Sequence, residues 1–252
     1  MSARFLRGAP RLPARLRRLS ARGALLAACL GLAPSAAAEI VSARYAEPTD
    51  RYPHGVLGDP SEYTVLEVDT AVGERLRLRW DRPMVFEDTA PRLVDFDGDG
   101  APEVLAVESH EALGARFTIY ELVGGVLRPR ARNPFIGTRF RWLAIVGAGD
   151  LDGDGAMEVA YVDRPHLAKT LRIWRVDGTE VTEIASLPGV TNHRIGEVDI
   201  AGGIRDCGAG PEMILADAAW ARLLAVRLAD GLSARDIGAH DGRASFSEAM
   251  AC

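Results

Sequence analysis

The sequence predicts an all-β protein, most simply a β-propeller of four blades with four short antiparallel strands in each. Three observations lead to this prediction. An acidic segment recurs at a spacing of about 55 residues, runs with the pattern of strands follow each copy, and no run has the period and length of a long amphipathic helix. Four-stranded units that cannot bury their faces alone are typical of radially repeated sheets. A sandwich or an open solenoid built from the same strands is the alternative.

The first 38 residues differ in composition from the rest. They contain seven arginines and no acid, and the apolar run at 23–33 is too short to cross a bilayer core of about 30 Å. An alanine triplet with the small-x-small cleavage pattern stands directly before Glu39. Residues 1–38 are therefore expected to be a signal peptide, cleaved near Ala38, and the mature chain to be periplasmic or secreted with no membrane span. A lipoprotein acylation box ending at Cys29 keeps a lipid anchor open as the alternative.

Removal of this segment makes the protein more acidic. The whole chain carries 30 basic and 35 acidic residues, for a formal charge of −5. Seven of the basic residues precede residue 39, so 23 basic residues face 35 acidic ones in the mature chain and the formal charge becomes −12. Nucleic acid is an unsuitable partner for such a chain, whereas cations and basic surfaces suit it.

An internal repeat divides the mature chain into units. The segment DFDGDGAPEVLAV at 95–107 matches DLDGDGAMEVAYV at 150–162, and an eroded copy, IRDCGAGPEMILA, follows at 204–216 with an offset of 54 residues. Such self-similarity at a fixed period is the signature of a repeat architecture. Residues 39–252 are thus expected to form a single domain with units at approximately 39–84, 85–137, 138–190 and 191–252.

Each unit is expected to contain four strands. An apolar strand, an alternating strand and a further strand follow each acidic segment. In the second unit they are expected at 104–107, 116–122 and 126–132. In the third unit they are expected at 159–162, 171–176 and 181–186, and in the fourth unit at 213–216, 222–228 and 232–237. The first unit is assigned the strands 40–45, 54–59, 62–68 and 74–80. Ring closure needs the last strands to meet the first, and the tail at 238–252 could do that.

Two cysteines remain after signal removal. Cys207 and Cys252 form a plausible disulfide in an oxidising compartment, and this bond would tie the tail to the fourth unit. Two unrelated thiols are the alternative.

The two intact acidic segments have a pattern that suits calcium. Carboxylates occupy positions 1, 3, 5 and 9 of each, and four acids in nine residues repel one another unless a cation lies among them. Calcium accepts six to eight oxygen ligands in loose geometry, and glycines at positions 4 and 6 permit the turn. Neither segment contains cysteine or histidine, which argues against zinc or copper. Two calcium sites are predicted, and solvated acidic turns without an ion are the alternative.

An EF-hand is excluded by the same residues. That motif needs a glutamate at position 12 and flanking helices, whereas position 12 is Ala106 or Tyr161 here and strands are expected on both sides.

The two loops resemble the Asp-x-Asp-x-Asp-Gly-x-x-(Asp/Glu) motif of FG-GAP or VCBS repeat proteins, whose repeats form integrin-α-like propellers. The resemblance covers roughly residues 85–230 and implies calcium on the loop that joins the first two strands of a blade, with ligands at positions 1, 3, 5, 7 and 9. The implied ligands are Asp95, Asp97, Asp99, Ala101 and Glu103, and Asp150, Asp152, Asp154, Ala156 and Glu158, the two alanines acting through their carbonyl groups.

This sequence departs from the family in two respects. Position 9 is glutamate where the family often has aspartate, and four blades are fewer than the seven of integrins. The third loop keeps only Asp206 and Glu212 of the expected acids and is not expected to bind calcium well.

No catalytic motif for a serine hydrolase, a zinc protease or a phosphate loop is present. The favoured function is therefore a non-catalytic binding or adhesion module with structural calcium, whose partner is a protein or a glycan. Residues Arg139, Arg141, His193 and Arg194 enter innermost strands and are candidates for a ligand face at one end of a central channel. They could also merely cover the blade ends. A periplasmic enzyme, or a protein that binds a small ligand or glycan in the channel, is the alternative function.

Overall fold

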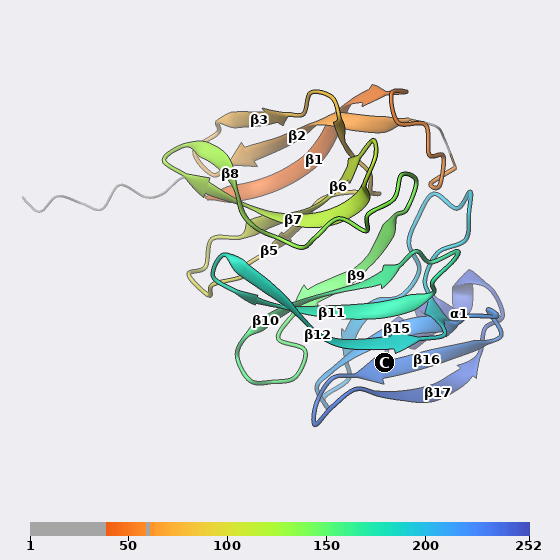
Figure 1. The fold of residues 1–252 in the computed structure, drawn as a ribbon. Coiled ribbons are helices and arrows are strands. Elements are labelled where there is room, and N and C mark those ends of the chain that lie inside the picture. Colours follow the sequence, from red (N-terminus) through yellow and green to blue (C-terminus); the bar gives the residue numbers. More distant parts are fainter. Residues whose placement is uncertain (1–38, 59–60) are drawn as a thin grey trace, which may run out of the picture. The chain divides into compact units, whose positions relative to one another are not determined.

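The structure, a computed structural model, describes residues 39–58 and 61–252, which form antiparallel β-sheets (Figure 1). The predicted all-β class is confirmed, since strands dominate and the described residues contain a single short helix, α1 (Arg243–Met250). These residues all belong to one compact unit of the chain. The predicted signal peptide, its cleavage site and Cys29 lie outside the described residues.

The first repeat unit departs from the prediction. Its described residues form β1 (Ile40–Thr49), β2 (Glu62–Thr70) and β3 (Arg75–Arg79), paired in the order β1-β2-β3. The strand expected at 54–59 is wrong over its described part, because Gly55 and Gly58 adopt φ values of 66° and 93° that extended strands do not use. This segment is instead a loop that carries His54.

The second and third units are meanders. The second contains β4 (Met84–Phe86), β5 (Arg92–Val94), β6 (Glu103–His110), β7 (Gly114–Val123) and β8 (Val126–Arg132). The third contains β9 (Leu143–Gly149), β10 (Met157–Asp163), β11 (Thr170–Asp177) and β12 (Glu180–Pro188), paired in sequence order. In the third unit, the single innermost strand β9 pairs with β10. In the second unit, two short strands take its place, because β4 and β5 pair with opposite ends of β6. Residues 87–91 therefore interrupt the innermost strand of the second unit.

The fourth unit repeats this interruption on a larger scale. It contains β13 (Val190–Thr191), β14 (Gly203–Asp206), β15 (Pro211–Asp217), β16 (Arg222–Arg227) and β17 (Ser233–Ala239). β13 and β14 pair with opposite ends of β15, and residues 192–202 separate them. The strands predicted after each acidic loop are confirmed, while the innermost strands of the second and fourth units are broken.

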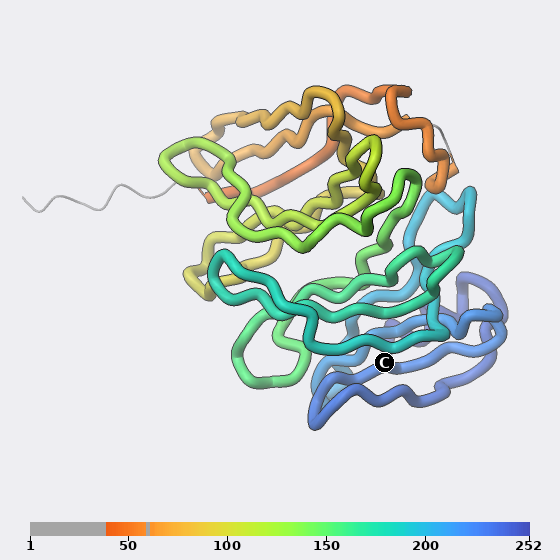
Figure 2. The backbone as a smooth tube through the Cα atoms, in the orientation of Figure 1, coloured from red at the N-terminus to blue at the C-terminus, as the bar shows by residue number. Residues whose placement is uncertain are grey.

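The core lies between successive units, which follow one another along the chain in Figure 2. Successive side chains of a strand point to opposite faces, and β6 uses both faces. Val104 and Ala106 pack with Leu66 of the first unit, whereas Leu105 and Val107 belong to a cluster that includes Tyr161 of the third unit. Burial on both faces explains why this strand is a continuous apolar run rather than an alternating one.

The tail does not pair with the first strands among the described residues. It forms α1, whose buried Phe246 packs against Ile214 and Leu223 of the fourth unit. Cys207 and Cys252 form a disulfide between the loop after β14 and the end of the chain. The strand pairing of the described residues leaves every sheet open.

Over residues 39–58 and 61–252, no helix has the length and apolar character needed to cross a membrane.

Candidate functional site

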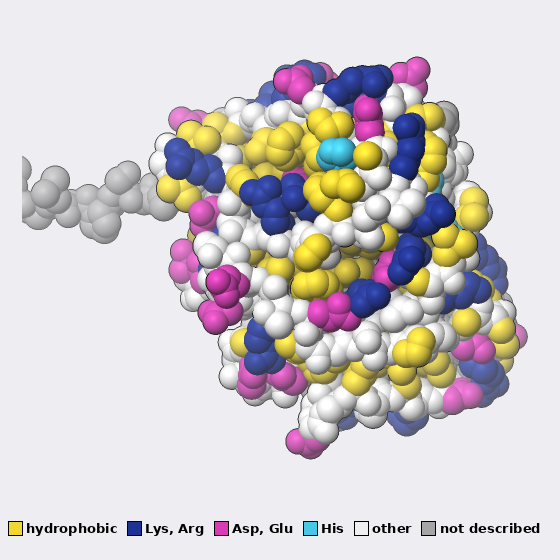
Figure 3. Space-filling model, in the orientation of Figure 1, with side chains coloured by type: hydrophobic (Ala, Val, Ile, Leu, Met, Phe, Trp, Pro, Cys, Tyr) yellow, Lys and Arg dark blue, Asp and Glu magenta, His cyan; other side chains and the backbone are white. Residues whose placement is uncertain are grey.

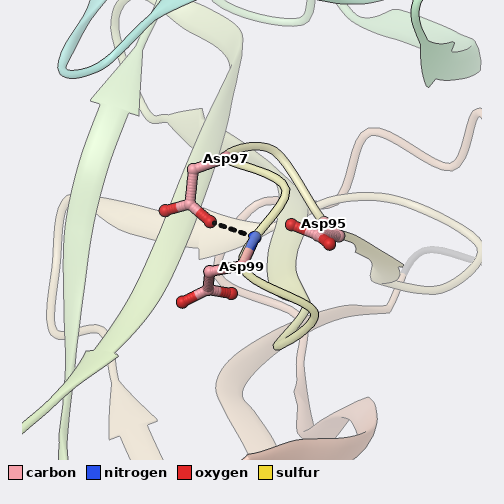
Figure 4. Close-up of side chains that lie close together, drawn as sticks. All are labelled: Asp95, Asp97 and Asp99. Carbon is pink, nitrogen blue, oxygen red and sulfur yellow. Dashed lines mark hydrogen bonds between the residues drawn. The ribbon is translucent and has the colours of Figure 1, made fainter.

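The two acidic loops join β5 to β6 and β9 to β10. In the first loop, Asp95 accepts the backbone N–H groups of Gly98 at 2.7 Å and Gly100 at 3.0 Å. Asp97 accepts the N–H of Asp99 at 3.3 Å, as Figure 4 shows. These bonds fold the loop around its own carboxylates. The turn requires positive φ values at both glycines, which glycine adopts without steric strain.

The second loop reproduces this geometry atom by atom. Asp150 accepts the N–H groups of Gly153 at 2.7 Å and Gly155 at 3.0 Å, and Asp152 accepts that of Asp154 at 3.3 Å. The duplication read from the sequence therefore extends to the side-chain hydrogen bonds.

The glutamate at position 9 anchors each loop to the sheet. Glu103 accepts the N–H of Phe96, and Glu158 accepts the N–H of Leu151, each at 2.8 Å. Both glutamates are buried, and burial raises the pKa of each carboxyl group above its ordinary value. One oxygen of each glutamate thus holds the loop, and the other accepts a hydrogen bond from an arginine side chain.

Two arginines that the sequence patterns did not indicate reach these loops. Arg175 donates to Asp152 and Asp154 at 2.6 Å and to Glu158 at 2.7 Å. Arg130 donates to Asp97 at 2.6 Å and to Glu103 at 3.1 Å. Arg175 stands directly opposite Glu158 in the pairing of β10 with β11, so strand register is the signal that could have identified it.

The donor sets suit calcium by their chemistry. Oxygen atoms of Asp95, Asp97 and Asp99 lie within 4.8 Å of one another, as do those of Asp150, Asp152 and Glu158. All are carboxylate oxygens, the ligand type that calcium prefers. In the remaining predicted positions, the N–H groups of Ala101 and Ala156 donate to Asp99 and Asp154 at 2.8 Å.

The strand pairing aligns the third loop differently from the fixed sequence offset of 54 residues. Asp206 directly precedes the turn, as Asp150 does in the third unit, and Arg205 pairs with Glu212 where Gly149 pairs with Glu158. Asp206 is therefore position 1, not position 3, and the loop is two residues shorter. It lacks the acids of positions 3 and 5 altogether, and the disulfide begins at its second residue.

The predicted ligand face lies at the other end of the strands. Because β9 spans seven residues, the acidic loop that follows it and the segment that precedes it are about 20 Å apart along the strand. In the view of Figure 3, acidic side chains gather on the side where the two loops lie, and several lysine and arginine side chains gather on the opposite side.

The four predicted face residues do not converge on one point. Arg141 borders a cavity, and His193 is fully buried behind His166. The exposed Arg139 lies over the ring of Phe140 at 4.4 Å, and Arg194 lies over the ring of Trp220 at 4.2 Å. Only Arg141 thus reaches the cavity directly, with His193 in support.

The cavity, of about 260 Å³, includes residues that the sequence patterns did not indicate. His54, Trp142 and His166 border it. Nδ1 of His54 forms a hydrogen bond with the carboxyl group of the fully buried Glu87, which also accepts the hydroxyl of Ser109. Burial raises the pKa of Glu87. The break in the innermost strand at 87–91 places Glu87 here, and no sequence pattern marked it.

His166 and His193 form a hydrogen-bonded pair. Nε2 of His166 lies 2.9 Å from Nδ1 of His193, and Nε2 of His193 lies 2.9 Å from the carbonyl of Glu197. Since a carbonyl can only accept, His193 donates from Nε2, and His166 must donate to His193 when both rings are neutral. Burial and the neighbouring His193 lower the pKa of His166 to about 4, and burial also lowers that of His193.

Residues 95–161 match the family model of the FG-GAP-like repeat. A comparison with curated proteins found no match. The matched segment runs from the first residue of one acidic loop, through the whole second loop, to β10, and so contains both duplicated sites. The chain therefore contains an FG-GAP-like repeat segment that spans both acidic loops.

Proposed function

We propose that this protein is an exported, calcium-binding FG-GAP repeat module that acts by non-catalytic binding or adhesion, with calcium in a structural role. The observation that carries the proposal is the pair of acidic loops with the same hydrogen-bond geometry, each bringing three carboxylates within 4.8 Å. The ligands would be carboxylates of Asp95, Asp97, Asp99 and Glu103, and of Asp150, Asp152, Asp154 and Glu158, with the carbonyls of Ala101 and Ala156. Bound calcium would neutralise carboxylates that arginines only partly neutralise.

Export is supported by the composition of residues 1–38 and by the cysteine pair. An arginine-rich segment with a short apolar run is typical of signal peptides, and disulfides persist in oxidising compartments. The proposed location is therefore the periplasm or the exterior, and the proposed partner a protein or a glycan.

We also propose that the four units are arranged as propeller blades. Support comes from a contact between the first and fourth units, where the N–H of Gly196 donates to the carbonyl of Val56 at 3.1 Å. The close approach requires glycine at position 58, since a Cβ atom there would lie 2.9 Å from the carbonyl oxygen of Gly196. A crystal structure with strand pairing or packing that separates these units would contradict the arrangement.

Calorimetry with calcium and with a chelator tests the calcium role. Calcium that binds only the native state stabilises it by about 1 to 3 kcal/mol at ten- to hundredfold excess over its Kd, so the melting temperature should rise with calcium. An Asp97→Asn/Asp152→Asn variant should lose most of this rise, while Asp177→Asn, a change outside the loops, should retain it. An unchanged melting temperature in calcium would contradict the proposal.

One observation favours a second candidate, recognition of a small ligand at the end opposite the acidic loops. His54 of the first unit, Arg141 and His166 of the third and Ile195 of the fourth border the same cavity. Pockets assembled between repeated units are common ligand sites. This candidate is compatible with structural calcium, because the two sites lie at different ends of the strands.

A further inference from the structure

The cavity beside Arg141 combines a cation with a wall of aromatic side chains. Phe140 and Trp142 border it, and neither Asp nor Glu is among its described lining residues. At about 260 Å³ it lies near the lower limit of volumes typical of small-molecule sites, about 300 Å³. A ligand that fits must therefore be small.

Arg141 has an uncommitted charge. Of the two arginines that border the cavity, Arg164 donates from two nitrogens to Asp163 at 2.8 and 2.9 Å. Arg141 donates to the carbonyl oxygen of Phe140 at 2.8 Å, and none of the ion pairs of the described residues includes it. A planar guanidinium without a carboxylate partner is suited to bind a carboxylate from a ligand.

The walls of the cavity are held in place before any ligand arrives. The ring of Phe140 stacks on that of His54, with 5.1 Å between the ring centroids. The backbone N–H of Phe140 donates to the hydroxyl of Tyr52 at 2.8 Å. The indole N–H of Trp142 donates to the carbonyl of Glu87 at 2.8 Å. Such fixed aromatic groups bind without a large loss of side-chain entropy.

Two residues in the cavity wall have an unfavourable backbone conformation. Phe140 and Arg164 adopt φ values of 55° and 45°, in the left-handed region that bulky residues seldom use. Strained conformations of this kind cluster at ligand sites, where the surrounding structure holds them.

Exposed apolar side chains form the rim. Leu167 and Ile195 border the cavity, and 64% and 72% of their surfaces are exposed. An apolar ligand body that packs against both side chains would remove this apolar surface from water, which favours binding.

We propose that this cavity binds a small carboxylate with an aromatic or branched apolar body, its carboxylate paired with Arg141 and its body against Phe140, Trp142, Leu167 and Ile195. One guanidinium supplies one positive charge, which matches a monoanionic carboxylate better than a phosphate dianion. The inference rests on the proposed binding role of this end of the molecule and names the class of ligand that it recognises.

Isothermal titration of the full chain in calcium tests this assignment with three probes: phenylacetate, phenylacetamide and inorganic phosphate. Phenylacetate should bind, and the neutral amide should bind about tenfold more weakly, the equivalent of one ion pair of about 1.4 kcal/mol. Phosphate, which has no apolar body, should bind more weakly than phenylacetate. Equal binding of the acid and the amide, tighter binding of phosphate, or no binding of phenylacetate at millimolar concentration would each overturn the proposal.

A matched pair of variants locates the site. Arg141→Gln should weaken phenylacetate about tenfold, whereas Arg139→Gln, a change in the exposed neighbour that lies over Phe140, should alter affinity less than about twofold. Arg141→Gln should fold normally, since the Arg141 side chain donates to a single backbone carbonyl, and the melting temperature of the variant serves as the check. Equal effects of the two variants would contradict the assignment.

The same samples distinguish failure of this proposal from failure of the calcium proposal. If phenylacetate does not bind but calcium still raises the melting temperature, only the carboxylate site is rejected. If phenylacetate binds but calcium has no effect, only the calcium role is rejected.

Discussion

The two ends of the strands are built in different ways. At one end, the acidic loops repeat the same hydrogen bonds at the same distances in successive units, with Asp95 and Asp150 in equivalent roles. At the other end, His54, Arg141, His166 and Ile195 come from three different units and border one cavity with side chains of different chemical types.

This difference fits the two proposed roles, structural support at the acidic end and ligand recognition at the cavity end. The acidic loops of the second and third units have the same geometry because each of them turns the chain between two paired strands of its unit. The cavity end uses loops and breaks in the innermost strands, such as residues 87–91 and 192–202, where the chain is free of strand pairing and can place individual side chains. Changes at the two ends should therefore be separable by experiment.

The largest effect is expected at the third loop, where a disulfide stands in place of acids. Cys207→Ser should lower the free energy of unfolding by about 2 to 4 kcal/mol, because the bond closes a loop with a sequence separation of 45 residues. Chemical denaturation measures it. Cys252→Ser and the double variant should lose the same amount, and a larger loss in the double variant would show that each cysteine has a separate role.

The cavity end should be sensitive to Gly114. A Cβ atom there would lie 2.3 Å from the carbonyl oxygen of Thr138 and 2.7 Å from that of Arg141, and its φ is 72°. Gly114→Ala should therefore cost about 2 to 3 kcal/mol of stability and weaken phenylacetate binding.

Gly124→Ala is the matched control for that change. Gly124 has a φ of 59°, but a Cβ atom at this position would have no neighbouring atom within 4 Å. Backbone strain alone should therefore lower the free energy of unfolding of this variant by about 1 to 2 kcal/mol, and its affinity for phenylacetate should be unchanged. If both variants affect binding equally, the close approach at Gly114 does not position the cavity.

A pH effect should come from the histidine pair at the cavity end. The pKa of His166 is lowered to about 4, and that of His193 is also lowered, both chiefly by burial, whereas an unfolded histidine titrates near 6.5. The unfolded chain then binds more protons between these values, so the stability from the neutral pair is complete above about pH 6.5 and is lost as the pH falls toward about 4. His54 and Lys169 near His166 oppose its protonation, whereas Glu197 and Asp199 favour protonation of His193 and Arg243 opposes it.

The slope per histidine should be below the limit of about 1.4 kcal/mol per pH unit, because His166 is partly exposed. Denaturation between pH 5 and pH 7 measures it, with a His166→Gln/His193→Gln variant as the comparison. An unchanged slope in that variant would assign the pH dependence to other groups.

The smallest effect should distinguish the two acidic loops from each other. Arg175 contacts three acids and Arg130 contacts two, so Arg175 competes more strongly with a bound cation. Arg175→Gln should raise the calcium affinity of its loop about three- to tenfold, and Arg130→Gln should raise that of the other loop less. Calcium titration by calorimetry measures both, and an unchanged or lower affinity in Arg175→Gln would indicate that the arginine helps to hold the loop open for calcium.

The acidic loops and most strands were predictable because their signals are local. Asp95 and Glu103 are only eight residues apart and belong to the same loop. The strands that follow the acidic loops are buried on both faces, so their continuous apolar composition identifies them. The strand expected at 54–59 and the register of the third loop could not be predicted. The first depends on positive φ values at Gly55 and Gly58, and the second on a two-residue deletion that a fixed offset conceals.

The sequence by itself determined that this chain is a duplicated all-β repeat protein with two carboxylate-rich loops, because repetition, strand pattern and loop chemistry are each carried by neighbouring residues. Only the tertiary structure decided that arginines from other strands reach those loops, that α1 covers the fourth unit, and that His54, which contacts Glu87, borders the same cavity as Arg141. The physical reason is that these contacts join residues tens of positions apart, whose approach is set by how the sheets pack and not by any local pattern.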